Sequence, residues 1–153
     1  MNLGITWKQF DLSLLFQGQA KVINTIQETW VDPSSGGAGN LMQWWTEDMW
    51  TPENTDGTKP RLGTPNKING TTFTNINAAF FKLKNAEIGY TLPVAVREKI
   101  GVANARVYLS GTNLFSFDHM RGMGIDPEAT GSGYGGWALN PQRLINLGVN
   151  VSF

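Results

Sequence analysis

The chain has 153 residues, with 12 basic and 12 acidic side chains, no cysteine and a charged fraction of only 16%. Zero net charge gives no electrostatic basis for binding nucleic acid, and the lack of cysteine excludes disulfides and thiolate metal sites within this chain. Average soluble domains are about 25% charged, whereas this chain is rich in glycine (18), tryptophan (6) and phenylalanine (8). This composition favours an all-β chain with tight turns and a large apolar surface.

Two alternating segments open the chain. In residues 1–7 the odd positions from Leu3 to Trp7 are apolar, and in residues 10–20 the even positions from Phe10 to Phe16 are apolar. Alternation with a period of two is typical of a strand that has one apolar and one polar face. The dipeptide between them, Lys8-Gln9, is short enough for a tight hairpin, although it lacks the usual Asn-Gly signal.

Three further strands are predicted, over residues 81–92, 105–117 and 143–153. Pro93 ends the first of them, because proline cannot donate to a strand ladder. Residues 94–100 then have the pattern of one or two helical turns that end at Gly101. The last strand has the strictest alternation, with apolar side chains at every odd position from Ile145 to Phe153.

The connections between these strands alternate in length. A short turn at 8–9 is followed by a long segment at about 21–79, a compact link at 93–104 and a long loop at 118–142. Long unstructured loops are uncommon in compact soluble domains, but outer-membrane barrels combine short periplasmic turns with long extracellular loops. We therefore predict an antiparallel transmembrane β-barrel segment, with about five strands of a larger barrel, because unpaired strand edges in lipid would be costly.

Several segments resemble one family in order along the chain. Phe81–Pro93 is similar to the "F-x-R/K-L-K-N-x-x-L/I-G-Y-T-L-P" signature of SusC/RagA-type TonB-linked outer-membrane proteins, with Lys82 where the family often has Arg. Arg106–Phe115 is similar to the family's "R-V-Y-x-S-x-x-N-L-F" strand. The remaining matches are a "W-T-P-E-N…P-R" loop motif at Trp50–Asn54 with Pro60-Arg61, a loop motif at Asp126–Glu128, and the closing strand Gly148–Phe153.

This resemblance implies the C-terminal portion of a TonB-dependent nutrient importer in the Gram-negative outer membrane. It implies uptake of oligosaccharides or peptides with a SusD-like surface lipoprotein, energy from the TonB system through an N-terminal region, insertion by the barrel-assembly machinery, and contact with outer-membrane lipid. No cofactor and no nucleic-acid partner are expected. The segment after Met1 lacks the features of a signal peptide, and the family's plug is not found, so we expect a fragment that transports only as part of a whole receptor.

Candidate functional residues follow from this interpretation. The family resemblance implies an assembly signal at the terminal aromatic residue and the apolar positions before it, namely Phe153, Val151 and Val149. Aromatic residues near strand ends are candidates for the girdles at the membrane interfaces; these are Trp7, Tyr90, Phe115 and Phe117. Three tryptophans in the long segment are candidates for ligand or partner contact, since an indole can stack on a sugar ring; these are Trp44, Trp45 and Trp50.

Other chemistries find little support. His119 is the single histidine, and one imidazole with nearby carboxylates is not a metal site without more ligands. No spacing of acidic residues enforces a pair of catalytic carboxylates, so we do not predict an enzyme. Two alternatives remain at this point: a soluble carbohydrate-binding β-sandwich module that uses the tryptophan-rich loop, or a truncated fragment without function.

Overall fold

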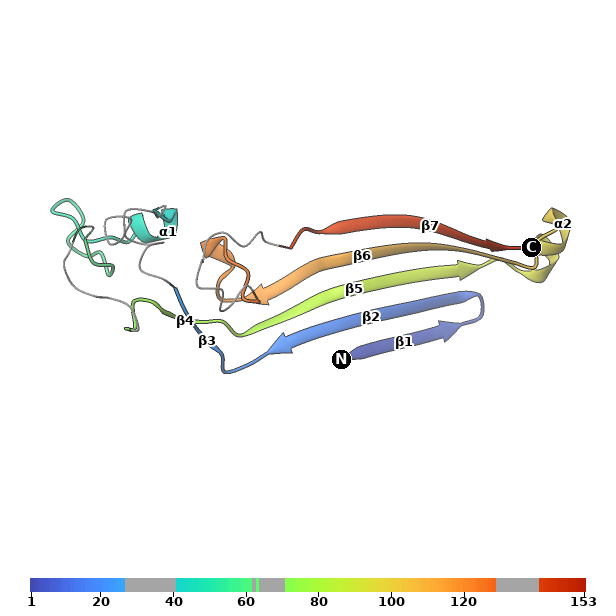
Figure 1. Ribbon diagram of the computed structural model, residues 1–153, viewed down its shortest axis with the longest axis horizontal. Coiled ribbons are helices and arrows are strands. Elements are labelled where there is room, and N and C mark those ends of the chain that lie inside the picture. The colour runs from blue at the N-terminus through green and yellow to red at the C-terminus, as the bar shows by residue number, and fades with distance from the viewer. Residues whose placement is uncertain (27–40, 62, 64–70, 129–140) are drawn as a thin grey trace. The chain divides into compact units, whose positions relative to one another are not determined.

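The computed structural model describes residues 1–26, 41–61, 63, 71–128 and 141–153. Five long strands form one sheet in the order β1-β2-β5-β6-β7 (Figure 1). Their bounds are Asn2–Trp7 (β1), Phe10–Gln19 (β2), Phe80–Thr91 (β5), Asn104–Asp118 (β6) and Leu144–Ser152 (β7). Each lies within about two residues of a predicted strand. Neighbouring strands run in opposite directions, so the sheet is antiparallel throughout (Figure 1).

Tight connections join the strands at one end of the sheet. Between β1 and β2, Lys8 has φ = 55° in the hairpin turn, and Thr91 at the end of β5 donates its backbone N–H to the Gln9 carbonyl at 2.8 Å. Between β5 and β6 lies helix α2, Val94–Ile100, which begins after Pro93 and ends at Gly101 with φ = 73°. A glycine is suited to this last position because a side chain disfavours the left-handed conformation.

The longer connections belong to a second unit, which contacts within the chain separate from the sheet. The sheet unit comprises residues 1–18, 81–117 and 141–153, and the loop unit comprises residues 19–80 and 118–140. The predicted loops 21–79 and 118–142 extend over residues 27–40, 62, 64–70 and 129–140, which lie outside the described residues. Elsewhere they contain structure that the sequence did not predict: strands β3 (Ile23–Thr25) and β4 (Asn75–Asn77), helix α1 (Gln43–Thr46) and a 3-10 turn at Arg121–Met123.

The loop unit has a small core of its own. β3 pairs with β4 in antiparallel register, with Asn24 opposite Ile76. Ile26 and Trp45 are buried together, and partly buried apolar side chains pack against them: Met42, Trp44, Ile76, Met123 and Ile125. Apolar contacts therefore hold together segments of the two predicted loops. Among the described residues, no helix is long and apolar enough to cross a membrane.

Candidate functional site: the two faces of the sheet

The apolar face of the sheet is continuous across the paired strands. In β1 and β2 the opposed pairs are Leu3–Leu14, Ile5–Leu12 and Trp7–Phe10, and in β6 and β7 they are Ala105–Val151, Val107–Val149 and Leu109–Leu147. Ala105 is buried and Leu12 and Leu14 are half-buried, but the other side chains of these pairs remain exposed; Leu147, for example, is 75% exposed. Within the part of the chain that the structure describes, no second long sheet covers this face. A broad uncovered apolar face of this kind marks an interaction surface.

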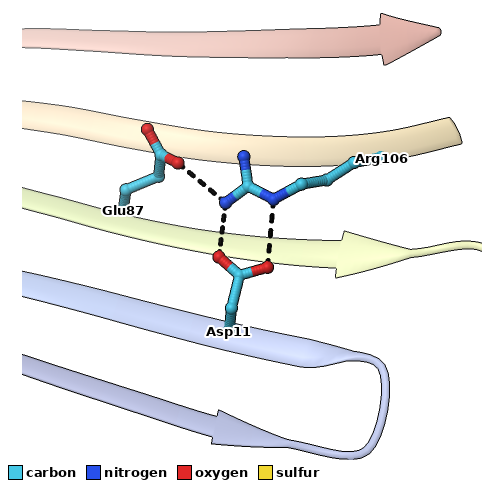
Figure 2. Close-up of polar contacts among 3 residues, drawn as sticks. All are labelled: Asp11, Glu87 and Arg106. Atoms are coloured by element: carbon cyan, nitrogen blue, oxygen red, sulfur yellow. Dashed lines mark hydrogen bonds and ion pairs between the residues drawn. The ribbon is translucent and has the colours of Figure 1, made fainter. Parts of the chain in front are cut away.

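The opposite face is polar and carries a three-residue ion cluster (Figure 2). Arg106 on β6 donates from Nε to Asp11 Oδ1 at 3.0 Å and from Nη2 to Asp11 Oδ2, so that the pair is bidentate. The same Nη2 donates to Glu87 Oε1 on β5 at 2.7 Å. One guanidinium thus joins three strands, β2, β5 and β6. Charge-assisted, bidentate contacts are among the stronger hydrogen bonds in proteins.

Glycines make room for long side chains on this polar face. A Cβ built on Gly89 would lie 2.2 to 2.5 Å from Arg106 Nη2, Nε and Cζ, so the guanidinium lies directly over this glycine. A Cβ on Gly148 would lie 2.2 Å from the Tyr108 ring in the same way. Arg106 Cζ is also 5.2 Å from the centroid of that ring. The polar face therefore has a flat layer in which two side chains of β6 lie across glycines of the neighbouring strands.

The alternation of faces shifts by one residue near the far end of β6. Asn113 has φ = 52°, and a Cβ on Gly111 would lie 2.6 Å from the side chain of Leu114. Leu114 therefore lies on the same face as Gly111, three residues earlier, as expected of a bulge that adds one residue to the strand. Continued alternation puts Phe115 and Phe117 on the polar face. Their ring centroids are 5.3 Å apart. A girdle role requires the apolar face, so this geometry does not favour the prediction made for these two residues.

The other predicted girdle residues, Trp7 and Tyr90, lie together near the hairpin end of the sheet. Tyr90 packs against Phe10 at 4.7 Å between ring centroids, and Phe10 pairs with Trp7 across the hairpin. Trp7 is 64% exposed, and the Lys8 ammonium lies 4.7 Å from the centroid of its ring. Aromatic and basic side chains at the end of an apolar face fit a membrane interface.

The residues of the predicted assembly signal lie at the end of β7. Val149 pairs with Val107 and Val151 pairs with Ala105 on the apolar face, while Phe153 follows the strand and is fully exposed. The Ser152 carbonyl before it accepts the backbone N–H of Ala103 at 2.8 Å. Their role in assembly stays a prediction.

The three candidate tryptophans of the loop unit have different environments. Trp45 is 1% exposed and packs edge-to-face on Trp44 at 5.6 Å, so it belongs to the core of the unit rather than to a contact surface. The Trp44 indole N–H is buried and has no hydrogen-bond acceptor among the residues that the structure describes. Trp50 is 41% exposed. Of the three, Trp50 alone has the exposure that a ligand or partner contact needs.

The segment around Trp50 is held by Asp48. Thr58 donates its hydroxyl and its backbone N–H to the Asp48 carboxylate, the latter at 3.2 Å, and these bonds, together with the nearby Lys59 ammonium at 3.9 Å, lower the pKa of Asp48 below its usual value. Trp50 donates its backbone N–H to the Lys59 carbonyl at 2.9 Å. A Cβ on Gly57 would lie 2.6 Å from the backbone of Met49, so the segment closes tightly on itself. The "W-T-P-E-N" motif thus lies in an ordered loop.

The ion cluster is the feature that the sequence reasoning missed. Its three residues, Asp11, Glu87 and Arg106, occupy polar-face positions of predicted strands. Opposite charges at such positions were the signal in the sequence that could have indicated the cluster. His119, by contrast, is exposed, and no group of three or more potential metal-ligating His, Cys, Asp or Glu side chains occurs among the described residues.

Known proteins resemble this chain in sequence and in structure. TonB-dependent receptor P3 of Formosa agariphila is 29% identical over 99% of this chain and 16% of its own length. TonB-dependent receptor P26 of the same organism is 34% identical over 69% of this chain and 12% of its own length. The chain thus spans less than a sixth of the length of either relative. No family model matches it.

Solved structures of RagAB are similar to this chain in fold. The RagAB peptide importer in the "open-open" state aligns with a TM-score of 0.68 and 26% identity, covering 99% of this chain and 16% of that chain. The structure of the RagAB peptide transporter aligns with a TM-score of 0.62 and 29% identity, covering 85% of this chain and 14% of that chain.

Proposed function

Because the chain belongs to the TonB-dependent receptor family and its sheet is a segment of a larger transmembrane β-barrel, we propose that it forms part of the wall of an outer-membrane nutrient importer. The whole receptor takes up peptides or oligosaccharides. The observation that carries this proposal is the alignment of 99% of the chain with a RagAB importer structure at a TM-score of 0.68.

The two faces of the sheet support a wall function. The apolar face, with Leu147, Val149 and Ile5 uncovered, suits contact with lipid, and the polar face with its ion cluster suits a wet interior. Exposure of this many apolar side chains to water is unfavourable, because each side chain of this size gains roughly 1.5–3 kcal/mol when it leaves water. Lipid on one side and an aqueous lumen on the other satisfies both faces.

The partners of the proposed importer follow from the family. A SusD-like surface lipoprotein captures the nutrient, the TonB system supplies energy through a part of the receptor outside these residues, and the barrel-assembly machinery inserts the strands. Because the similar RagAB structures are those of a peptide importer, peptides are the first substrate class to test. Trp50 in the ordered loop is the residue of this chain that we propose for contact with ligand or lipoprotein.

The rival β-sandwich module fits less well. A sandwich buries the apolar face of one sheet against a second sheet about 10 Å away. In the described part of the chain the second sheet is only the two-stranded pair β3–β4, which belongs to the loop unit. The buried position of Trp45 also weakens a sugar-binding platform made of tryptophans.

The experiment is uptake by cells that produce the full-length receptor together with a SusD-like lipoprotein. Labelled peptides and oligosaccharides are supplied to cells with the receptor, without it, and with the receptor but without TonB. We expect receptor- and TonB-dependent accumulation of one of the two substrate classes, and a receptor in the outer-membrane fraction. Uptake that is unchanged when the receptor is deleted, with the receptor recovered from the soluble fraction, would refute the proposal.

A further inference from the structure

A shallow groove on the apolar face extends across four neighbouring strands of the sheet. It is lined mainly by apolar side chains of four strands: Leu12 on β2, Ala86 and Ile88 on β5, Leu109 on β6 and Ile145 on β7. The small Ala86 leaves space between longer neighbours. Leu114, which the bulge at Asn113 returns to this face, lines the groove over Gly111. The groove is a recess in a surface that otherwise consists of projecting aliphatic side chains.

A cation and three aromatic rings lie on the same face beyond this groove, towards the hairpin. Leu12 is followed towards the hairpin by Phe10, which contacts Tyr90, and then by Trp7 beneath the Lys8 ammonium. Leu12 pairs with Ile5, which is three residues from Lys8, so Lys8 lies roughly 10 Å from Leu12 at the rise of a β-strand. One leaflet of a bilayer has a hydrocarbon depth of about 15 Å, half of the ~30 Å core. The cation and the near side of the groove therefore lie within the depth of one leaflet.

The Lys8 ammonium has a defined position at the hairpin. Lys8 adopts φ = 55°, the positive value that a tight hairpin turn requires at this position. Within the described residues no carboxylate is paired with Lys8, and its ammonium is held over the exposed Trp7 ring.

We propose that this track is a binding site for one anionic phospholipid of the periplasmic leaflet. The headgroup phosphate lies at Lys8 beside Trp7, and an acyl chain passes Phe10 and Tyr90 into the groove at Ala86. Short turns such as Lys8-Gln9 lie on the periplasmic side of outer-membrane barrels, which selects that leaflet. The lipid surface is the occupant because the groove is continuous with the apolar face of a barrel segment. The inference rests on the proposed function, since it requires that this face meets the membrane.

The test is native mass spectrometry of the full-length receptor after reconstitution with phosphatidylglycerol and phosphatidylethanolamine. Lys8→Gln removes the cation, and Lys21→Gln is its matched control, because Lys21 is also exposed and also has a positive φ of 57°. We expect the wild type to retain phosphatidylglycerol preferentially. Lys8→Gln is expected to lower this retention about fivefold, the change that one basic residue near an anionic lipid surface produces, and Lys21→Gln to leave it unchanged.

A second pair of variants tests the groove. Ala86→Phe fills it, and Leu3→Phe puts an aromatic ring on the same face outside it. Ala86→Phe is expected to reduce retention of both lipids, whereas Leu3→Phe is not; heat-modifiable migration on gels shows that each variant is folded. Equal retention in Lys8→Gln and Lys21→Gln, or in the two phenylalanine variants, overturns the lipid site.

The location of the receptor separates this inference from the proposed function. A receptor in the outer membrane that retains only detergent, or both lipids without preference, refutes the site but leaves the importer proposal standing. A receptor that is not in the outer membrane refutes both.

Discussion

Replacing Arg106 with methionine tests the ion cluster of the polar face. The substitution keeps an unbranched side chain over Gly89 but removes all three charge-assisted hydrogen bonds. It also leaves the Asp11 and Glu87 carboxylates near each other without a cation. We expect the barrel that contains this segment to lose stability, because like charges on neighbouring strands of one face repel.

The magnitude follows from the number of bonds and their exposure. Hydrogen bonds to charged groups contribute about 1.5–3 kcal/mol each when buried, whereas exposed ion pairs contribute about 0.2–1 kcal/mol. The side chain of Arg106 is 21% exposed, that of Asp11 33% and that of Glu87 37%. The bidentate bond to Asp11 therefore falls between these limits and the bond to Glu87 near the lower one. Their sum predicts a loss of about 2–3 kcal/mol for Arg106→Met, and below about 1 kcal/mol for Glu87→Gln.

The assay is equilibrium unfolding of the refolded receptor in urea with lipid or detergent micelles. Lys99→Met on helix α2 is the control, since Lys99 is exposed and an unpaired surface cation contributes little. A double-mutant cycle of Asp11→Asn with Arg106→Met isolates the pair. If Arg106→Met costs no more than Lys99→Met, or the two mutations of the cycle are additive, the cluster does not join the strands as described.

Three further predictions use other features of the chain. Gly89→Ala displaces the Arg106 guanidinium, whereas Gly4→Ala on the same face meets nothing within 4 Å; unfolding should show a loss for Gly89→Ala that disappears in the Arg106→Ala background, where no long side chain lies over Gly89, and a loss that persists there would refute the link. Leu147→Arg should destabilise the membrane-inserted barrel by about 2–4 kcal/mol and Asn146→Arg by little, as measured by refolding into vesicles, because charge is costly on the lipid face alone; equal costs would contradict the assignment of faces. The hydrogen bonds from Thr58 lower the pKa of Asp48, so the stability that they add is complete above the usual aspartate pKa and is lost as pH falls through the lower folded value. Hydrogen exchange at the Thr58 and Lys59 amides should therefore quicken in acid relative to neighbouring amides. Asp48→Asn should abolish this pH dependence.

The long strands were predictable because alternation is a local property of the sequence. The pattern from Ile145 to Val151 defines one strand and its apolar face without any knowledge of neighbours. Pro93 and Gly101 likewise predict the bounds of helix α2 from backbone restrictions alone. These features need no tertiary information.

What sequence reasoning missed depends on contacts between distant segments. Whether Asp11 meets Arg106, 95 positions away, depends on the register between strands, which a period of two does not specify. The shift of faces at Asn113 went unnoticed because a single asparagine in a strand is a weak signal for a bulge, and the expectation for Phe115 and Phe117 rested on uninterrupted alternation. Trp45 was proposed for ligand or partner contact because it lies in a predicted loop. Its burial comes from packing with Ile26, which the sequence pattern does not indicate.

Cysteine scanning across β7 tests the central claim, that the two faces of this sheet meet lipid and water. The chain contains no cysteine, so single cysteines at positions 145–147 and 149–151 can be placed in a full-length receptor whose other cysteines, if present, are replaced. Gly148 is left unchanged because the Tyr108 ring lies over it. The receptor in membranes is treated with a small water-soluble maleimide. We expect labelling at 146 and 150 and protection at 145, 147, 149 and 151. Equal labelling at all six positions would contradict the assignment of faces, because both faces would then be in water.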